Sequence, residues 1–204
     1  MIYQILVSGT TIGLFLQVVP ITVILGASYI ILRIIYLKKK QIPIKWGLEI
    51  IRTLFVCYLT GLINLVLVPR NLWSCIWADI FIGYSGSEIG LFDGSFNFTP
   101  IVFKIISGEV TLGSWVKTML AGNLLMFIPM GFFIPLVTNK VDFKKILKVA
   151  VVIPIIIEVI QPIVGRSFDI DDIILNFAGI MMGYLCVACI KIFCKKTFGK
   201  KLSG

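Results

Sequence analysis

Residues 158–183 carry a dense group of polar side chains inside an apolar part of the chain. Glu158 and Gln161 lie three residues apart, and Arg166 follows them. Three carboxylates then fall within four positions: Asp169, Asp171 and Asp172. Because a carboxylate next to hydrocarbon is costly unless it is paired, hydrated or protonated, we interpret this stretch as the lining of a site.

These residue types permit three kinds of chemistry. Glu158 could act as a general acid or base, with Asp172 or Asp169 ionised near Arg166. Asp169, Asp171 and Asp172 could instead supply the oxygen ligands that Ca²⁺ or Mg²⁺ prefers, although their D-x-D-D spacing lacks the rest of an EF-hand loop. The third possibility is recognition of an amphiphile that carries polar or charged groups. We expect no resident cofactor.

A purely structural role is the alternative to all three. Asp169 or Asp171 would then cap a helix, while Asn123 and Asn176 would form hydrogen bonds between helices. Glu49 and Arg52, one helical turn apart, are interpreted in the same way, as a neutralising pair near a membrane interface. The alternative is that Arg52 points into the helix bundle and holds another buried polar group.

The composition places these residues in a membrane protein. Of the 204 residues, 58% are hydrophobic and 14% are charged, whereas a soluble domain carries roughly 25% charged residues. The sequence has no histidine, which excludes Ser-His-Asp triads and the commonest metal ligand. Cys186 and Cys189 form a C-x-x-C pair, but inside an apolar run we expect them to pack rather than to undergo redox chemistry.

Five apolar runs are long enough to cross about 30 Å of hydrocarbon as helices. They are residues 12–37, 47–68, 115–137, 146–164 and 172–193. The sequence therefore predicts an all-α, polytopic integral membrane protein, with residues 1–204 forming a single domain.

Residues 70–114 form the one long connection between these runs. Their aromatic residues and scattered acids predict segments that lie in the membrane interface, with a short helix near residues 71–81. Residues 99–106 are apolar but too short to span, so a strand, a re-entrant piece and an interfacial helix all stay open.

Basic residues indicate the orientation of the chain. Lysines cluster at residues 38–45, at 140–148 and at the C-terminus. The positive-inside rule makes that side cytoplasmic, so we expect the N-terminus outside, the C-terminus inside, and both residues 70–114 and the turn 166–172 outside. The net charge of +9 then reflects topology and contact with lipid headgroups rather than a nucleic-acid partner.

Helical spacing relates the polar residues to a packing surface. Asp172, Asn176, Gly179 and Gly183 are separated by four, three and four positions, which is one stripe of a helix. A Gly-x-x-x-Gly pair lets a neighbouring helix approach closely. We expect helix packing at Pro129, Gly131, Gly179 and Gly183. We expect one outward-facing pocket to be lined by Asn123, Glu158, Gln161, Arg166, Asp169, Asp171, Asp172 and Asn176.

At these residues the sequence resembles the VanZ-like family of membrane proteins. The resemblance is strongest over residues 47–190, with Arg52 and Pro69 upstream. Its motifs are Asn123 followed by Phe127-x-Pro129-x-Gly131, then Glu158-x-x-Gln161, Arg166-x-x-Asp169-x-Asp171-Asp172, Asn176, Gly179 and Gly183. The resemblance implies a bacterial cytoplasmic-membrane protein, since some family members lower susceptibility to the lipoglycopeptide teicoplanin. It supplies no settled catalytic mechanism.

The sequence thus leads to one favoured function and two alternatives. The favoured function is lowered susceptibility to teicoplanin through binding of the antibiotic, or of a lipid-linked envelope precursor, at the outward polar pocket and among membrane lipids. The first alternative is a membrane-embedded enzyme that modifies a lipid-linked envelope substrate with Glu158 and the aspartates, above all Asp172. The second is an accessory subunit whose polar residues only hold helices together.

Overall fold

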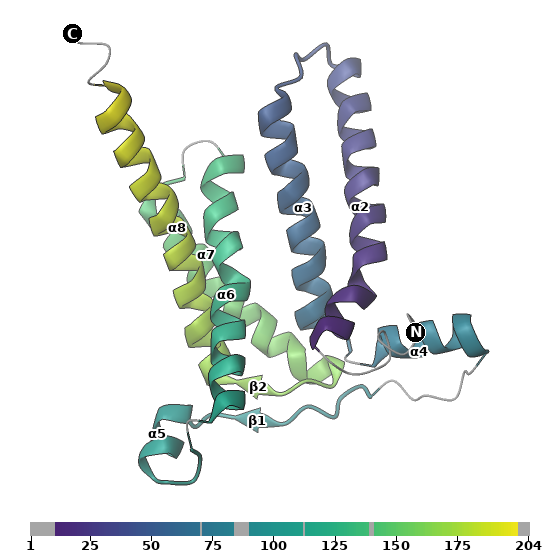
Figure 1. Cartoon of the computed structure of the whole chain (residues 1–204), viewed down its shortest axis with the longest axis vertical. Helices are drawn as coiled ribbons and strands as arrows, with labels where there is room; N and C mark the ends of the chain where they lie inside the picture. Colours follow the sequence, from purple (N-terminus) through teal and green to yellow (C-terminus); the bar gives the residue numbers. More distant parts are fainter. Residues whose placement is uncertain (1–10, 70, 84–89, 112, 139–140, 200–204) are drawn as a thin grey trace. The chain divides into compact units, whose positions relative to one another are not determined.

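The computed structural model describes residues 11–69, 71–83, 90–111, 113–138 and 141–199 (Figure 1). Arg70, Lys140, Lys200 and Lys201, which contribute to the predicted charge distribution, lie outside the described residues. The elements, in chain order, are α2 (Thr11–Lys39), α3 (Trp46–Leu67), α4 (Leu72–Ile82), β1 (Phe96–Asn97), α5 (Ile101–Ile106), α6 (Ser114–Val137), α7 (Phe143–Ile160), η1 (Gln161–Val164), β2 (Phe168–Asp169) and α8 (Ile170–Gly199).

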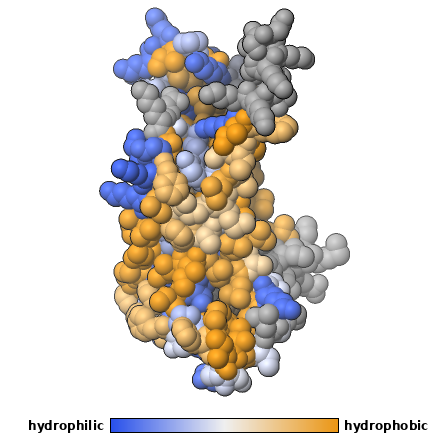
Figure 2. Space-filling view, turned by 90° about the vertical axis from the view of Figure 1, so that its left-hand side faces the viewer, coloured by the Kyte–Doolittle hydropathy of each residue, from blue (hydrophilic) through white to orange (hydrophobic). Residues whose placement is uncertain are grey.

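The predicted all-α, polytopic membrane architecture is confirmed. Within the described residues, five segments are long and apolar enough to cross a membrane: Leu16–Lys39, Trp46–Leu67, Val116–Val137, Phe143–Val164 and Ile170–Cys194. Large apolar side chains remain exposed along them, including Leu32, Ile35 and Leu54. Figure 2 shows apolar side chains over much of the visible face. Such a surface is suited to contact with lipid tails rather than with water.

The chain between the second and third spans contains short elements of its own. The predicted short helix is α4, which begins at Leu72 and ends at Ile82. Gly83 closes it with a positive φ of 63°, and its N–H donates to the carbonyl of Asp79 at 2.9 Å. Of the three possibilities for residues 99–106, the structure has a short helix, α5.

The described residues divide into two compact units. The first comprises residues 1–98 and 156–169, and the second comprises residues 99–155 and 170–204. The first unit therefore holds α2, α3, α4, both strands and η1, while the second holds α5, α6, α8 and most of α7. That residues 1–204 form one domain stays a prediction.

In the first unit, α2 and α3 form an antiparallel hairpin (Figure 1). Its tight packing is visible at Gly26, where a Cβ atom would lie 2.5 Å from the Sγ of Cys57 on α3. The Nε2 of Gln17 on α2, a buried amide, donates to the Oγ of Ser74 on α4 at 3.1 Å. The hairpin is thereby tied to the helix that follows it.

In the second unit, α6 and α8 pack closely enough that backbone meets backbone. A Cβ on Gly131 of α6 would overlap the carbonyl of Ile180 on α8. On α8, a Cβ on Gly179 or Gly183 would overlap the carbonyls of two α6 residues, Leu124 and Ile128. We call this contact the glycine seam, defined by Gly131, Gly179 and Gly183. Phe127 and Ile180 are fully buried beside it.

Candidate functional site

Glu158 lies near the end of α7 with its side chain completely buried. Its Oε2 accepts a hydrogen bond from the backbone N–H of Asp169 at 3.0 Å. When the Gln161 amide is oriented to satisfy both of its ends, its nitrogen donates to Oε2 at 2.9 Å and to Oε1 at 3.2 Å. The same nitrogen is 3.1 Å from the carbonyl oxygen of Ser167. A buried carboxyl group is thus held by donors from the turn that follows its own helix.

The local sequence explains how that turn returns toward Glu158. Pro162 lacks an N–H and cannot continue the α-helical ladder, and residues 161–164 form the 3₁₀ turn η1. Gly165 then adopts a positive φ of 70°. A Cβ on Gly165 would also overlap the carbonyl of Gly90, so both conformation and space favour glycine here.

Arg166 connects this turn to the end of α3. Its Nε donates to the carbonyl of Val68 at 3.1 Å, and Val68 is the residue that caps α3 in an extended conformation. The last carbonyls of a helix have no partner within the helix, and cationic side chains are favourable there. Arg166 therefore fixes the turn to the α2–α3 hairpin within the same unit.

A short parallel strand pair extends from this turn. Phe96 of β1 pairs with Phe168 of β2, and Asn97 pairs with Asp169. The Nδ2 of Asn97 donates to the Oδ2 of Asp169 at 2.9 Å. The hydroxyl of Ser95 donates to that of Ser167 at 2.8 Å. We call this set the polar ladder: Ser95, Asn97, Ser167 and Asp169.

An aromatic cluster belongs to the same strand pair. The ring centroids of Phe98 and Phe168 are 5.1 Å apart, and Phe96 lies 6.0 Å from Phe168. Phe96 and Phe98 are 62% and 64% exposed. Since neighbouring positions of a strand point to opposite faces, Phe96 and Phe168 lie on one side of the pair and Asn97 and Asp169 on the other.

The remaining predicted site residues belong to the second unit. The Nδ2 of Asn123 on α6 donates to the Oδ1 of Asp172 in the first turn of α8. The Oδ2 of Asp171 accepts from the backbone N–H of Ile101 at 2.8 Å. Asn176, one turn after Asp172, is 3% exposed, and no described residue donates to its Oδ1.

The eight predicted pocket residues therefore form two groups. Glu158, Gln161, Arg166 and Asp169 belong to the first unit, and Asn123, Asp171, Asp172 and Asn176 belong to the second. That they line one pocket stays a prediction. Asp169, Asp171 and Asp172 each contact a different partner, and the described part of the chain holds no cluster of three or more His, Cys, Asp or Glu side chains that could bind a metal ion.

Sequence reasoning missed two contributors to these polar contacts. Asn97 lies in the long connection, far from Asp169 in sequence, and nothing in its own neighbourhood indicated the strand pairing. Arg33 is the second. Its side chain joins the pair of Glu49 and Arg52 that the sequence predicted. An arginine inside the first apolar run was the available signal, because an intramembrane charge calls for a partner.

Comparison with known proteins gives a family match. The VanZ/LLP1 family model matches residues 55–192, a range that contains both polar groups and the glycine seam. No curated protein and no solved structure matches the chain.

Proposed function

This chain belongs to the VanZ/LLP1 family, and from that premise we propose that it lowers bacterial susceptibility to teicoplanin by binding an amphiphile. The amphiphile is the lipoglycopeptide itself or a lipid-linked envelope precursor. Both combine an apolar chain with a headgroup rich in hydrogen-bonding groups.

The strand pair of the first unit is the observation that carries this proposal. One of its sides presents the exposed rings of Phe96 and Phe98, and the other presents the pairing of Asn97 with Asp169. An amphiphile needs both surfaces close together, because its chain is stabilised by apolar contact and its headgroup by hydrogen bonds. Aromatic rings also give large contact areas at small cost in conformational entropy.

Glu158 and its two donors support the same function, because one of these donors is the backbone N–H of Asp169, a residue of the polar ladder. Burial of a carboxyl group lowers stability unless donors compensate it, and here donors come from Asp169 and Gln161. A buried apolar side chain at this position would need no hydrogen-bond donors. We infer that Glu158 fixes the Asp169 backbone, and with it the orientation of the polar ladder toward a ligand.

In the second unit, Asn176 supports a further polar contact. Its Oδ1 is buried and accepts no hydrogen bond from the described residues, although buried carbonyl oxygens normally have a donor. Asp172 lies one turn earlier on α8, and the Nδ2 of Asn123 on α6 donates to it. We infer that this second group, within its own unit, takes a donor from a polar ligand or from a water molecule.

We also propose the bacterial cytoplasmic membrane as the location, with the N-terminus outside and the C-terminus inside. The lysine clusters at residues 38–45 and 140–148 and at the C-terminus support this orientation through the positive-inside rule. The strand pair would then face the side from which a glycopeptide arrives.

A susceptibility assay tests the proposal. Strains expressing the wild-type chain, Glu158→Gln, Arg166→Ala or Asp172→Asn are compared for teicoplanin susceptibility, with membrane abundance measured in each strain. We expect each variant to lose most of the protection at unchanged abundance. Glu109→Gln is the matched control. Glu109 is an exposed acid that accepts a hydrogen bond only from the nearby Ser107 hydroxyl among the contacts of the described residues, so this variant should protect like wild type. Full protection by all three variants would contradict the proposal.

A further inference from the structure

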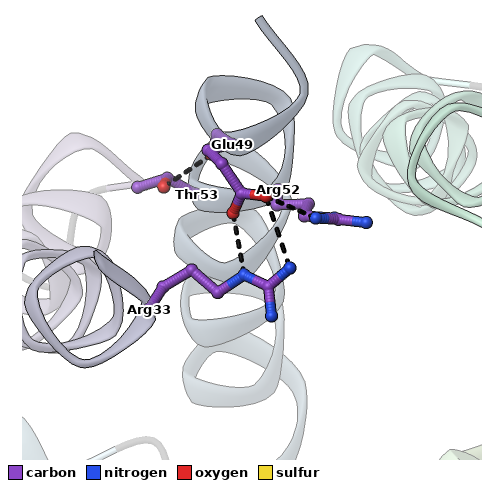
Figure 3. Close-up of polar contacts among 4 residues, drawn as sticks. All are labelled: Arg33, Glu49, Arg52 and Thr53. Atoms are coloured by element: carbon purple, nitrogen blue, oxygen red, sulfur yellow. Dashed lines mark hydrogen bonds and ion pairs between the residues drawn. The ribbon is translucent and has the colours of Figure 1, made fainter. Parts of the chain in front are cut away.

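A three-residue charged cluster joins α2 and α3 of the first unit (Figure 3). Arg33 of α2 donates from Nε to the Oε2 of Glu49 at 2.9 Å and from Nη2 to Oε1 at 3.3 Å. Arg52 of α3 donates from Nη1 to the same Oε1 at 2.5 Å. We call this set the arginine cluster: Arg33, Glu49 and Arg52.

Burial and charge are unequal within the arginine cluster. The side chain of Glu49 is 7% exposed, whereas those of Arg33 and Arg52 are 27% and 26% exposed. One carboxylate cannot neutralise two guanidinium groups, so the cluster keeps one positive charge. Within the described part of the chain, Glu49 is the only acid within ion-pair distance of either arginine.

The unused donors of the cluster are directed away from Glu49. A guanidinium group has five N–H donors, and Figure 3 shows nitrogens of both arginines pointing away from the carboxylate. Two planar forks side by side are well suited to the oxygens of a phosphate group. A carboxylate ligand would satisfy fewer of these donors, since it offers two oxygens.

The position of the cluster near one end of each span fits the level of a lipid headgroup. Arg33 precedes the end of α2 by six residues and Arg52 follows the start of α3 by six, which is about 9 Å along each helix axis. Tyr36 lies beside Arg33, with the guanidinium carbon 5.5 Å from its ring centroid. Trp46 is exposed at the same end. Both aromatic types gather at the membrane–water interface.

Exposed lysines surround this end of the hairpin: Lys38, Lys39, Lys40 and Lys45. They strengthen the attraction of anionic headgroups to the same place. The lysines alone would attract any anionic surface, whereas the arginines are fixed by Glu49 and are therefore ordered before a ligand arrives.

We propose that the arginine cluster is a binding site for the phosphate of an anionic phospholipid. The lipid phosphate would bind the donors that Glu49 leaves unused and would neutralise the remaining charge, while its acyl chains would lie on the apolar surface of α2 and α3. Glu49 is the element that holds the two forks in position. This site is separate in sequence and in chemistry from the strand pair to which the amphiphile was assigned.

Native mass spectrometry of the full chain in neutral detergent tests this proposal. Phosphatidylglycerol and phosphatidylcholine are titrated separately against wild type, Arg52→Gln and the control Lys45→Gln. We expect wild type to prefer phosphatidylglycerol, and Arg52→Gln to bind it about fivefold more weakly, the effect of one basic residue at an anionic headgroup. Lys45→Gln removes the same charge from the same end but no donor of the cluster, and because Lys45 is exposed and its charge is screened by salt, it should weaken binding less than Arg52→Gln does.

Three results would overturn the proposal. They are an absence of lipid preference in the wild-type chain, unchanged phosphatidylglycerol binding by Arg52→Gln, and equal weakening by Arg52→Gln and Lys45→Gln. If Arg52→Gln fails to fold, the wild-type preference and Arg52→Lys decide together. Arg52→Lys keeps the charge but lacks the planar guanidinium fork, so it should lose part of the affinity. Inorganic phosphate is added as a competitor, and displacement of the lipid at equal concentration would contradict a lipid source of the phosphate.

Discussion

In the α6–α8 pair, close contact is made by glycines and backbone carbonyls, whereas in the turn after α7 it is made by a buried carboxyl group and its donors. Gly131, Gly179 and Gly183 remove side chains so that two helices can meet. Glu158 instead requires compensation from Asp169 and Gln161. The first arrangement gains stability directly from dispersion contacts.

The difference between the two regions separates a structural role from a functional one. Helix packing alone explains the glycine seam. Packing does not explain the buried carboxyl group of Glu158, because an apolar side chain of similar size would leave no charge to compensate. We therefore expect changes in the seam to act on folding, and changes around Glu158 to act on ligand binding more than on folding.

The largest expected effect is on stability, from a methyl group in the seam. Gly131→Ala places a Cβ against the carbonyl of Ile180, and because that obstacle is backbone we expect the protein to lose about 3 kcal/mol of unfolding free energy. Thermal unfolding of the purified protein in detergent measures this. Gly122→Ala, on the same helix with nothing within 4 Å of its Cβ, should be as stable as wild type or more so. Equal stability of the two variants would contradict a role of the glycine seam in stability.

The second effect concerns Glu158. Glu158→Gln keeps the shape of the side chain but weakens the bonds with Asp169 and Gln161, so we expect a loss of about 1–2 kcal/mol in stability and loss of protection against teicoplanin. Chemical denaturation and the susceptibility assay are measured on the same variant. A variant that is destabilised but still protects would make Glu158 structural, like the seam.

The aromatic side of the strand pair should give a smaller effect. Removing the exposed rings with Phe96→Ala and Phe98→Ala together should weaken binding of an amphiphile by at least about fivefold, because each aromatic contact is worth roughly 0.5–1.5 kcal/mol. Stability should change little. Phe103→Ala, an equally exposed phenylalanine on α5, is the control. Equal affinities for all three proteins would show that these rings do not contact the ligand.

Asn176 should give the smallest change in stability. Because its Oδ1 has no donor among the described residues, Asn176→Leu should leave the unfolding free energy unchanged within about 0.5 kcal/mol or raise it. Protection should nevertheless fall if the amide contacts the headgroup. A strongly destabilised Asn176→Leu would place this residue with the seam rather than with the site.

The helices could be predicted from the sequence because apolar length alone sets the number of spans. The five predicted runs differ from the observed spans by only a few residues at their ends. The Gly-x-x-x-Gly spacing predicted the close approach at Gly179 and Gly183. Packing at Gly131 was predicted as well, but not that Gly131 meets α8, since periodicity does not say which neighbouring helix a stripe contacts.

The polar contacts could be predicted only in part. Glu158, Gln161 and Arg166 stand out because polar residues are rare in such a chain. The pairing of Asn97 with Asp169 depends on a strand pair of two residues on each side, which is too short to leave an alternating pattern. Arg33 meets Glu49 only because α2 and α3 form a hairpin, a tertiary contact that no local spacing encodes.

Direct binding tests the central claim most closely. Isothermal titration of teicoplanin, and in parallel of a lipid-linked envelope precursor, is carried out with the purified wild-type chain, with Glu158→Gln plus Arg166→Ala, and with Glu109→Gln. We expect wild type and Glu109→Gln to bind one of these amphiphiles with equal affinity, and the double variant to bind it at least about tenfold more weakly, a loss of roughly 1.4 kcal/mol. Equal affinity of the folded double variant, or no binding of either amphiphile to wild type, would contradict it.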